Sequence, residues 1–481
     1  MSLKKKAVGG LFWTFTQQFS NKIISFVVSI ILARLLSPSQ FGLIGMLSIF
    51  ISVGTSLLDS GMTSSIIRTK KADEADYSTV FILNMLASLI IYLIVFLLAP
   101  FIADFYKQPV LKDLVRVYSL TFFFSAIMGI QSAKLTKEMN FKVQMIMEIP
   151  SIIAGGALGI FLAYKGFGVW SLVYMFLLQA GLLSLQHWYY SDWRPSFQFS
   201  IPKFKEHFNF GYKVTLHGLI GTLYSNIFTI IIGRFYSAAQ LGFYSRALSL
   251  RQFPISNLSA ALEKVTFPMF SSINDDDVKM KSVYKRLIQQ VIFWIVPFLM
   301  LMIISAEPLF RVLLTEKWVP AVPYFQILCV SGILIPLVSY NGNIIKVKGR
   351  TDIILKIQIF EKTFSVVAIL VALQFGLYAL LYSQIVSTIL SYVLFAHFGG
   401  RMVNYSMMEQ LKDIFPSVSL ALLISGGTWL LNHYVINLFQ IGDFPRLILE
   451  SVFYFVLYLG ISQLFKLKAI LDFRQLLFKT N

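Results

Sequence analysis

Polar side chains follow one face of an otherwise apolar segment, residues 7–34, near the start of the chain. Seven of them lie on this face or directly beside it: Thr14, Gln17, Gln18, Asn21, Lys22, Ser25 and Ser29. Spacings of three and four residues place such side chains in one stripe along a helix. Lys22 lies roughly 18 to 22 Å from either end of a helix over this segment, beyond the reach of its side chain. A cation among amides and hydroxyls inside hydrocarbon suits an anionic ligand, since it offsets the ligand's charge and replaces lost water. We therefore predict that Lys22, Gln18 and Asn21 bind an anionic ligand.

A competing interpretation gives Lys22 a carboxylate partner. Asp59 and Glu148 lie in other apolar segments, and either one could form a buried ion pair with this lysine. The two interpretations are compatible, because a carboxylate can hold the lysine until a ligand arrives. Asp59 with Gly61 can instead mark an irregular helix, in which the glycine permits close packing and the aspartate satisfies freed backbone groups.

Further charged residues occur in apolar segments of the second half of the chain. Arg246 and Arg251 are predicted to supply cations to the ligand, although Arg251 also suits an anchor at the membrane interface. His217 is a candidate for ion coupling, because histidine as a residue type can change its charge near neutral pH, whereas a lone histidine is more commonly a hydrogen-bonded core residue. Glu361 and Lys362 point about 100° apart on a helix, so they do not simply neutralise one another. Glu361 could bind a coupling proton or sodium ion, or form a salt bridge.

The composition is that of a membrane protein. Of the 481 residues, 57% are hydrophobic and 13% charged, and the mean hydropathy is +0.71, outside the range of soluble domains. A spanning helix needs about 20 mostly apolar residues, which predicts an all-α, polytopic fold with about 14 transmembrane helices. The segments are 7–34, 41–66, 79–103, 114–133, 144–164, 168–190, 209–233, 241–267, 287–305, 321–343, 353–373, 376–397, 414–432 and 447–465.

Two stretches of the sequence recur in the second half of the chain. Residues 31–42 are matched by 231–242 at Ile, Arg, Ser, Gln and Gly, and residues 167–174 are matched by 375–382. These matches predict two parallel six-helix lobes followed by two extra helices, an organisation typical of transporters. The predicted parts are an N-lobe (1–190), a cytoplasmic linker (191–208), a C-lobe (209–400), and the two extra helices with a cytoplasmic tail (401–481).

The basic residues predict the orientation. On these boundaries, 28 Lys and Arg residues lie on the side of the N-terminus and 11 on the other, so both termini should be cytoplasmic. The positive-inside rule then explains most of the net charge of +18, and no nucleic-acid partner is needed to explain it. The single cysteine, Cys329, excludes a disulfide framework and a cysteine-based metal site. No nucleotide-binding loop or zinc-protease motif is present, so we expect no cofactor, no metal and no catalytic residue.

Several motifs resemble those of one family. They are Arg34 to Gly42, Asp59 to Gly61, Leu241 to Ala247 and Val265 to Ser271. Together they resemble the bacterial Wzx-like polysaccharide and O-antigen flippases, the polysaccharide transporters of the multidrug/oligosaccharidyl-lipid/polysaccharide exporter superfamily. The likeness covers essentially the whole chain. One departure is that Ala238 stands where the first repeat has Pro38, so the two lobes are not equivalent at that turn.

The resemblance implies a function in the bacterial plasma membrane. Such a protein translocates a polyprenyl-pyrophosphate-linked oligosaccharide from the cytoplasmic to the outer leaflet, through a cavity that opens alternately to the two sides. Membrane lipids, a polysaccharide polymerase with its chain-length machinery, and a coupling H⁺ or Na⁺ are the further partners to expect. The alternatives are a cation-coupled multidrug exporter of the same superfamily and a membrane glycosyltransferase or polymerase. The cations Lys22 and Arg246 favour an anionic substrate over a cationic drug, and a polymerase should carry a long outer loop, which the segment boundaries do not leave room for.

Overall fold

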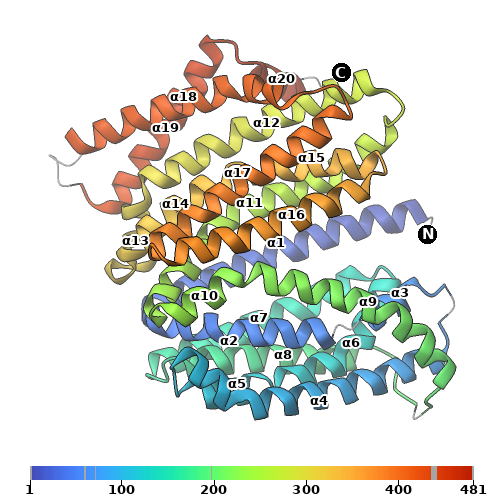
Figure 1. The fold of residues 1–481 in the computed structure, drawn as a ribbon. Helices are drawn as coiled ribbons and strands as arrows, with labels where there is room; N and C mark the ends of the chain where they lie inside the picture. Colours follow the sequence, from blue (N-terminus) through green and yellow to red (C-terminus); the bar gives the residue numbers. More distant parts are fainter. Residues whose placement is uncertain (1–2, 59–60, 71, 197, 435–440, 479–481) are drawn as a thin grey trace. The chain divides into compact units, whose positions relative to one another are not determined.

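The computed structural model describes residues 3–58, 61–70, 72–196, 198–434 and 441–478 (Figure 1). Throughout these residues the regular secondary structure is helical, without a strand, which confirms the predicted all-α class. The chain divides into two compact units, Met1–Ser245 and Arg246–Asn481. The lobe boundaries drawn from the repeat remain a prediction.

The first unit is built from ten helices and the beginning of an eleventh. They are α1 (Leu3–Leu35), α2 (Pro38–Leu58), α3 (Met62–Arg68), α4 (Glu74–Tyr106), α5 (Leu111–Tyr118), α6 (Thr121–Lys137), α7 (Phe141–Tyr164), α8 (Trp170–Tyr190), α9 (Ile201–Ser225), α10 (Ile227–Phe235) and the start of α11 (Ala238–Ser272). Helix α9 begins within the predicted linker and packs on α2, α3 and α4. The first helix of the second repeat is therefore part of the first unit.

The second unit holds the rest of α11 and the helices that follow it. They are α12 (Asp277–Ile304), α13 (Ala306–Leu314), the 3-10 helix η1 (Glu316–Ala321), α14 (Val322–Gly332), α15 (Ile335–Val347), α16 (Thr351–Leu373), α17 (Leu377–Arg401), α18 (Met407–Tyr434), α19 (Asp443–Leu464) and α20 (Lys468–Phe478). Its core includes α12 packed along α18, and α17 packed along α14, α15 and α16.

The lengths and hydropathies of these helices confirm a polytopic membrane protein. Ten helical segments are long and apolar enough to cross a bilayer, and α9 with α10 adds an eleventh if this bent pair is one span. Helices α8, α11 and α16 are not in that set in the described part of the chain. The count of fourteen spans therefore remains a prediction.

Four of the predicted spans are interrupted, namely 41–66, 114–133, 209–233 and 321–343. The first break follows from Gly61, whose φ of 58° lies in the left-handed region that favours glycine. A Cβ at Gly61 would lie 2.6 Å from the carbonyl oxygen of Gly211 in α9, so the glycine also permits a close approach of two backbones. The irregularity predicted at this glycine is present, while Asp59 lies outside the described residues. The third interrupted span bends by 46° between α9 and α10.

The repeated stretch caps two helices in the same way. At the start of α2, the Ser37 amide donates to Gln40 Oε1 at 2.9 Å and the Gln40 amide donates to Ser37 Oγ at 3.4 Å. At the start of α11, Ser237 and Gln240 make the same two bonds at 3.0 and 3.2 Å. Each pair is a capping box, which satisfies two backbone N–H groups that a helix start leaves without partners.

The two capped helix starts also pack against one another through glycines. A Cβ on Gly42 would lie 1.7 Å from the carbonyl oxygen of Ala238, and a Cβ on Gly242 would lie 1.9 Å from that of Pro38. Each copy of the repeat thus places its glycine against the first residue of the helix in the other copy. The contact is reciprocal, so the repeat in the sequence is also a local pseudo-two-fold arrangement in the first unit.

This contact predicts that a single methyl group at either glycine is destabilising. Gly42→Ala and Gly242→Ala should each lower the free energy of unfolding by about 1–3 kcal/mol or more, the cost of overpacking against a backbone that cannot move away. Gly426→Ala in α18 is the matched control, because its Cβ would have no atom within 4 Å and alanine favours helix over glycine. Thermal unfolding of detergent-solubilised protein measures all three. Equal midpoints for Gly42→Ala and Gly426→Ala would refute the close contact.

Candidate functional site

Helix α1 carries its polar stripe along α7, and glycines of α7 allow the two helices to approach closely. A Cβ on Gly156 would lie 2.6 Å from Val28 of α1, and a Cβ on Gly155 would lie 2.8 Å from the carbonyl oxygen of Met175 in α8. Small residues are the usual contact points between membrane helices. Lipid tails are as apolar as the side chains, so helices associate through close packing, which small residues allow. The spacing of glycines in α7 therefore positions the polar residues of α1.

The predicted ligand-binding residues of α1 lie at different depths in the first unit. Asn21 and Lys22 are half-buried, Gln17 is buried, and Gln18 is exposed. The Asn21 amide donates from Nδ2 to Glu148 Oε2 of α7. The structure thus brings two of the predicted residues into direct contact, with the carboxylate held beside the helix that carries Lys22.

Asn21 also presents an acceptor that its surroundings do not use. Its Oδ1 is buried and has no hydrogen-bond partner among the described residues. A buried acceptor left without a donor costs free energy. This position on α1 can therefore accept a hydrogen bond from a hydroxyl or amide group of a ligand.

The two predicted arginines lie in α11 and belong to the second unit. The side chains of Arg246 and Arg251 are 9% and 7% exposed. The Arg246 guanidinium lies 5.8 Å from the ring centre of Trp318, within the range of a cation–π interaction. Arg251 donates from Nη1 to Ser331 Oγ at 3.0 Å, so both guanidinium groups lie inside the unit.

The remaining predicted residues are spread over other helices. His217 is exposed on α9, and Glu361 and Lys362 are half-buried on α16. The structure brings together Asn21 and Glu148 from the predicted set, while the predicted sharing of one ligand by Lys22 and Arg246 stays a prediction.

A buried polar cluster, which the sequence analysis missed, joins α9 to α3 and α4. His207 Nε2 lies 3.0 Å from Asp76 Oδ1, and its Nδ1 lies 2.9 Å from Ser65 Oγ. Lys203 Nζ lies 3.0 Å from Asp76 and 3.3 Å from Asp73. Both His207 and Asp76 are fully buried. Two features of the sequence could have indicated this cluster. Asp73 and Asp76 have the spacing of a capping pair, and Lys203 and His207 are four residues apart, which places them on one face of a helix.

The segment between α8 and α9 is tied to the same end of α4. Trp193 donates its indole N–H to the Glu74 carboxylate at 3.0 Å. The Ser200 amide donates to Thr79 Oγ1 at 3.0 Å. These bonds hold the connection between α8 and α9 against α4 in the first unit.

The cluster predicts a large effect of removing Asp76. Asp76→Ala should lower the free energy of unfolding by about 3–5 kcal/mol, since it leaves the buried His207 without its carboxylate and removes the nearer of the two carboxylates beside Lys203. Asp352→Ala is the matched control, because the Arg350–Asp352 pair at 2.9 Å is exposed and solvent screens such a pair, so its loss should change stability little. Denaturation in detergent, which measures the free energy of unfolding, should show a much larger loss for Asp76→Ala than for Asp352→Ala. Similar losses of stability would contradict a structural role for the cluster.

Solved structures define the fold class of the chain. A structure titled "Lipid II flippase MurJ, inward closed conformation" aligns with 96% of this chain and 100% of its own, with a TM-score of 0.78 and 12% identity. An inward-facing multidrug resistance MATE family transporter of the MOP superfamily aligns with 80% of this chain and 96% of its own, with a TM-score of 0.60 and 17% identity. The chain therefore has the fold of these membrane transporters.

Sequence comparison identifies the family. The chain belongs to the polysaccharide biosynthesis protein family, whose model matches residues 31–323, a stretch that includes residues 31–42 and 231–242. The lipopolysaccharide biosynthesis protein WzxC of Escherichia coli K12 is 27% identical over 82% of this chain and 81% of its own. The teichuronic acid biosynthesis protein TuaB of Bacillus subtilis 168 is 26% identical over 73% of each chain. The predicted resemblance to Wzx-like polysaccharide transporters is confirmed.

Proposed function

We propose that this protein is a flippase that moves a polyprenyl-pyrophosphate-linked oligosaccharide from the cytoplasmic to the outer leaflet of a bacterial plasma membrane. Family membership supports a role in polysaccharide biosynthesis, as do the names of the relatives WzxC and TuaB. The observation that carries the proposal is the polar stripe of α1, with half-buried Lys22 next to the Asn21–Glu148 contact. Apolar transport substrates would need no such stripe inside hydrocarbon.

In this proposal, the polar residues of α1 replace the water that the head group loses. Lys22 offsets charge on the pyrophosphate, and Gln18 is available to saccharide hydroxyls. The Asn21 Oδ1 that lacks a donor accepts from a hydroxyl of the ligand. The prenyl tail stays in contact with hydrocarbon, so only the head group needs this environment.

Arg246 and Arg251 of α11 are the further cations of this proposal. The two copies of the repeat are offset by 200 residues. At this offset, Lys22 of the first copy corresponds to Thr222 of the second, and Arg246 of the second copy corresponds to Met46 of the first. The cations are therefore complementary across the duplication, as expected if two lobes share one substrate by alternating access. Arg251 assists Arg246 in binding the anionic head group. The candidates for coupling to H⁺ or Na⁺, or for ion pairs that hold the cations, are Asp59, Glu148, His217, Glu361 and Lys362.

Transport of this kind forms and breaks no covalent bond, so the protein acts without a catalytic residue and supplies substrate to a separate polymerase. A multidrug exporter is the second candidate, favoured by the MATE-like fold. The two candidates differ in the charge of the substrate, which makes the intramembrane cations the feature to test.

Removal of the Lys22 charge should therefore slow transport strongly. A hydrogen bond to a charged group contributes about 1.5–3 kcal/mol, so Lys22→Ala should slow translocation of a lipid-linked saccharide in liposomes by about 10-fold to 100-fold. Lys22→Arg should retain part of the rate, because it keeps the charge. Lys165→Ala, at an exposed lysine next to the end of α7, is the control and should behave as the parent protein. Normal transport by Lys22→Ala would rule out the proposed site, whereas loss of folded protein would favour the ion-pair interpretation.

The orientation predicts where reporters are active. A reporter that works only outside the cytoplasm should give no signal after Asn481 and a clear signal in the loop near Lys107, because the positive-inside rule places these positions on opposite sides. Measured activities from the two fusions test this directly. The opposite pattern would contradict the predicted topology.

A further inference from the structure

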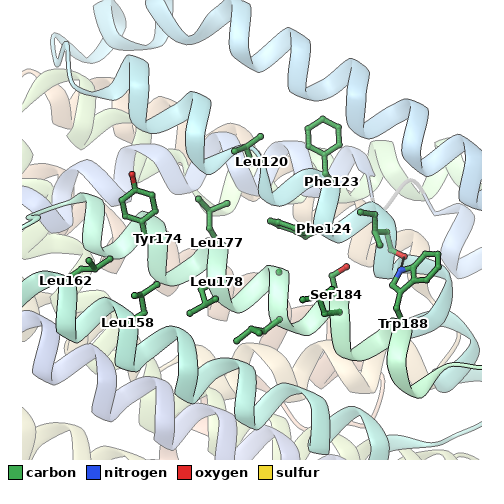
Figure 2. A pocket seen from close by; sticks show the side chains of 14 residues that line it. Leu120, Phe123, Phe124, Leu158, Leu162, Tyr174, Leu177, Leu178, Ser184 and Trp188 are labelled. Atoms are coloured by element: carbon green, nitrogen blue, oxygen red, sulfur yellow. Dashed lines mark hydrogen bonds between the residues drawn. The ribbon is translucent and has the colours of Figure 1, made fainter.

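A long apolar groove lies in the first unit between helices α6, α7 and α8. It has a volume of about 920 Å³ and is lined almost entirely by carbon. Figure 2 shows Phe123 and Phe124 of α6 on one side, Leu158 and Leu162 of α7 on another, and a row of side chains along α8. The groove opens on the parts of these helices that lie within the predicted spans 114–133, 144–164 and 168–190, where a hydrocarbon chain is the natural occupant.

The groove stays open because α8 lacks a side chain at its middle. Gly181 lines the groove, and a Cβ there would lie 3.6 Å from the ring of Phe124. At one end, Trp188 donates its indole N–H to the Ile127 carbonyl oxygen at 3.2 Å, so its ring forms a fixed wall. At the other end, Tyr174 stacks on Trp170 with ring centres 5.7 Å apart. Aromatic residues at both ends are typical of the two interfacial regions of a membrane helix.

The length of the groove discriminates between possible tails. From Tyr174 to Trp188, α8 rises by roughly 21 Å, whereas one leaflet provides only about 15 Å of hydrocarbon, half the thickness of the core. A phospholipid tail that stays in its own leaflet would leave part of the groove uncovered. A polyprenyl chain is long enough to cover it completely.

A fixed cation stands at the Trp188 end. The Arg194 guanidinium lies 5.4 Å from the ring centre of Trp188 and donates to the Trp188 carbonyl oxygen at 2.9 Å and to the Trp193 carbonyl oxygen at 2.8 Å. Its recorded hydrogen bonds, which include one to the Ser191 carbonyl oxygen, all go to main-chain oxygens, and in the described residues it forms no salt bridge. The side chain is exposed. It is therefore held in place with its charge available, and guanidinium groups suit phosphate oxygens.

We propose that this groove binds the isoprenoid tail of a polyprenyl phosphate or diphosphate lipid, with Arg194 at the phosphate. This inference deepens the proposed function, on which it rests, because it gives the lipid part of the substrate a docking site separate from the polar stripe of α1. The head group would be held on the side rich in Lys and Arg, where the sequence predicts the cytoplasm. The lipid is thereby captured before its saccharide crosses.

A photocrosslinking experiment on the full-length protein tests the proposal. The probe is a radiolabelled undecaprenyl phosphate that carries a photoactivatable group on its tail, added to the protein in phosphatidylcholine nanodiscs, with labelled peptides identified by mass spectrometry. We expect label on α6 and α8. We also expect that a large excess of phosphatidylglycerol displaces little of it, whereas unlabelled undecaprenyl phosphate displaces most.

Two matched pairs of variants locate the site. Gly181→Leu fills the groove, and Gly426→Leu places the same side chain where a Cβ meets no atom within 4 Å. Leu185→Trp obstructs the groove from a side chain that is 69% exposed, and Leu97→Trp is its control on α4 with the same exposure. We expect at least fivefold less crosslinking in the first member of each pair and no change in the second. If Gly181→Leu does not fold, the comparison of Leu185→Trp with Leu97→Trp still tests the groove.

The phosphate contact is tested separately. The parent protein should prefer undecaprenyl phosphate to uncharged undecaprenol, and Arg194→Gln should abolish that preference. Label on helices outside α6, α7 and α8, equal displacement by phosphatidylglycerol, or unchanged labelling of the groove-filling variants would each overturn the proposal. The binding test needs no saccharide, so a groove that binds polyprenyl phosphate in a protein that transports nothing would refute the proposed function and leave this site intact.

Discussion

Close contact through glycine is the constraint on which the rest of this structure depends. Inside hydrocarbon, two helices gain little by burying leucine, because lipid tails are as apolar as leucine itself. Packing and polar contacts must then decide which helices meet. Gly42 and Gly242 set the crossing of α2 and α11, Gly61 brings α3 to α9, and Gly156 brings α7 to α1. The positions of the functional side chains follow from these contacts.

Buried charged and polar groups are the second determinant. Such groups are costly to bury unless they are paired or hydrogen-bonded. The Asp76 cluster has its bonds satisfied and holds the start of α9 on α3 and α4. The Asn21–Glu148 contact leaves one buried acceptor unused. A buried polar site whose hydrogen bonds are all made suits a structural role, whereas one with an unused acceptor suits a site that binds and releases a ligand.

The sequence was a good guide to features that depend on local spacing. Hydropathy predicted the class and most of the spanning helices. The repeat predicted a duplicated chain whose two copies are not equivalent at the turn of Pro38 and Ala238, whereas the structure caps both helix starts in the same way. The structure adds that these two starts contact one another. Their reciprocal packing depends on residues about two hundred positions apart, for which a single sequence carries no direct signal.

Features that depend on tertiary contact were not predictable. The 46° bend between α9 and α10 falls within an apolar run that reads as one helix. Asp76 and His207 looked unrelated because they are separated by 131 residues. The groove requires Gly181 of α8 to face Phe124 of α6, and neither residue is unusual in its own segment. Hydropathy reports which residues are apolar, and does not report where apolar surface is left uncovered.

The central claim is that this chain moves a lipid-linked saccharide across a bilayer. The most direct measurement reconstitutes the purified protein in liposomes with a panel of labelled lipid-linked saccharides on one leaflet and follows label that becomes accessible on the other. The account predicts protein-dependent translocation of at least one polyprenyl-pyrophosphate-linked saccharide, with no translocation of cationic drugs. Transport of cationic drugs with none of the saccharide lipids would contradict it and assign the chain to multidrug export.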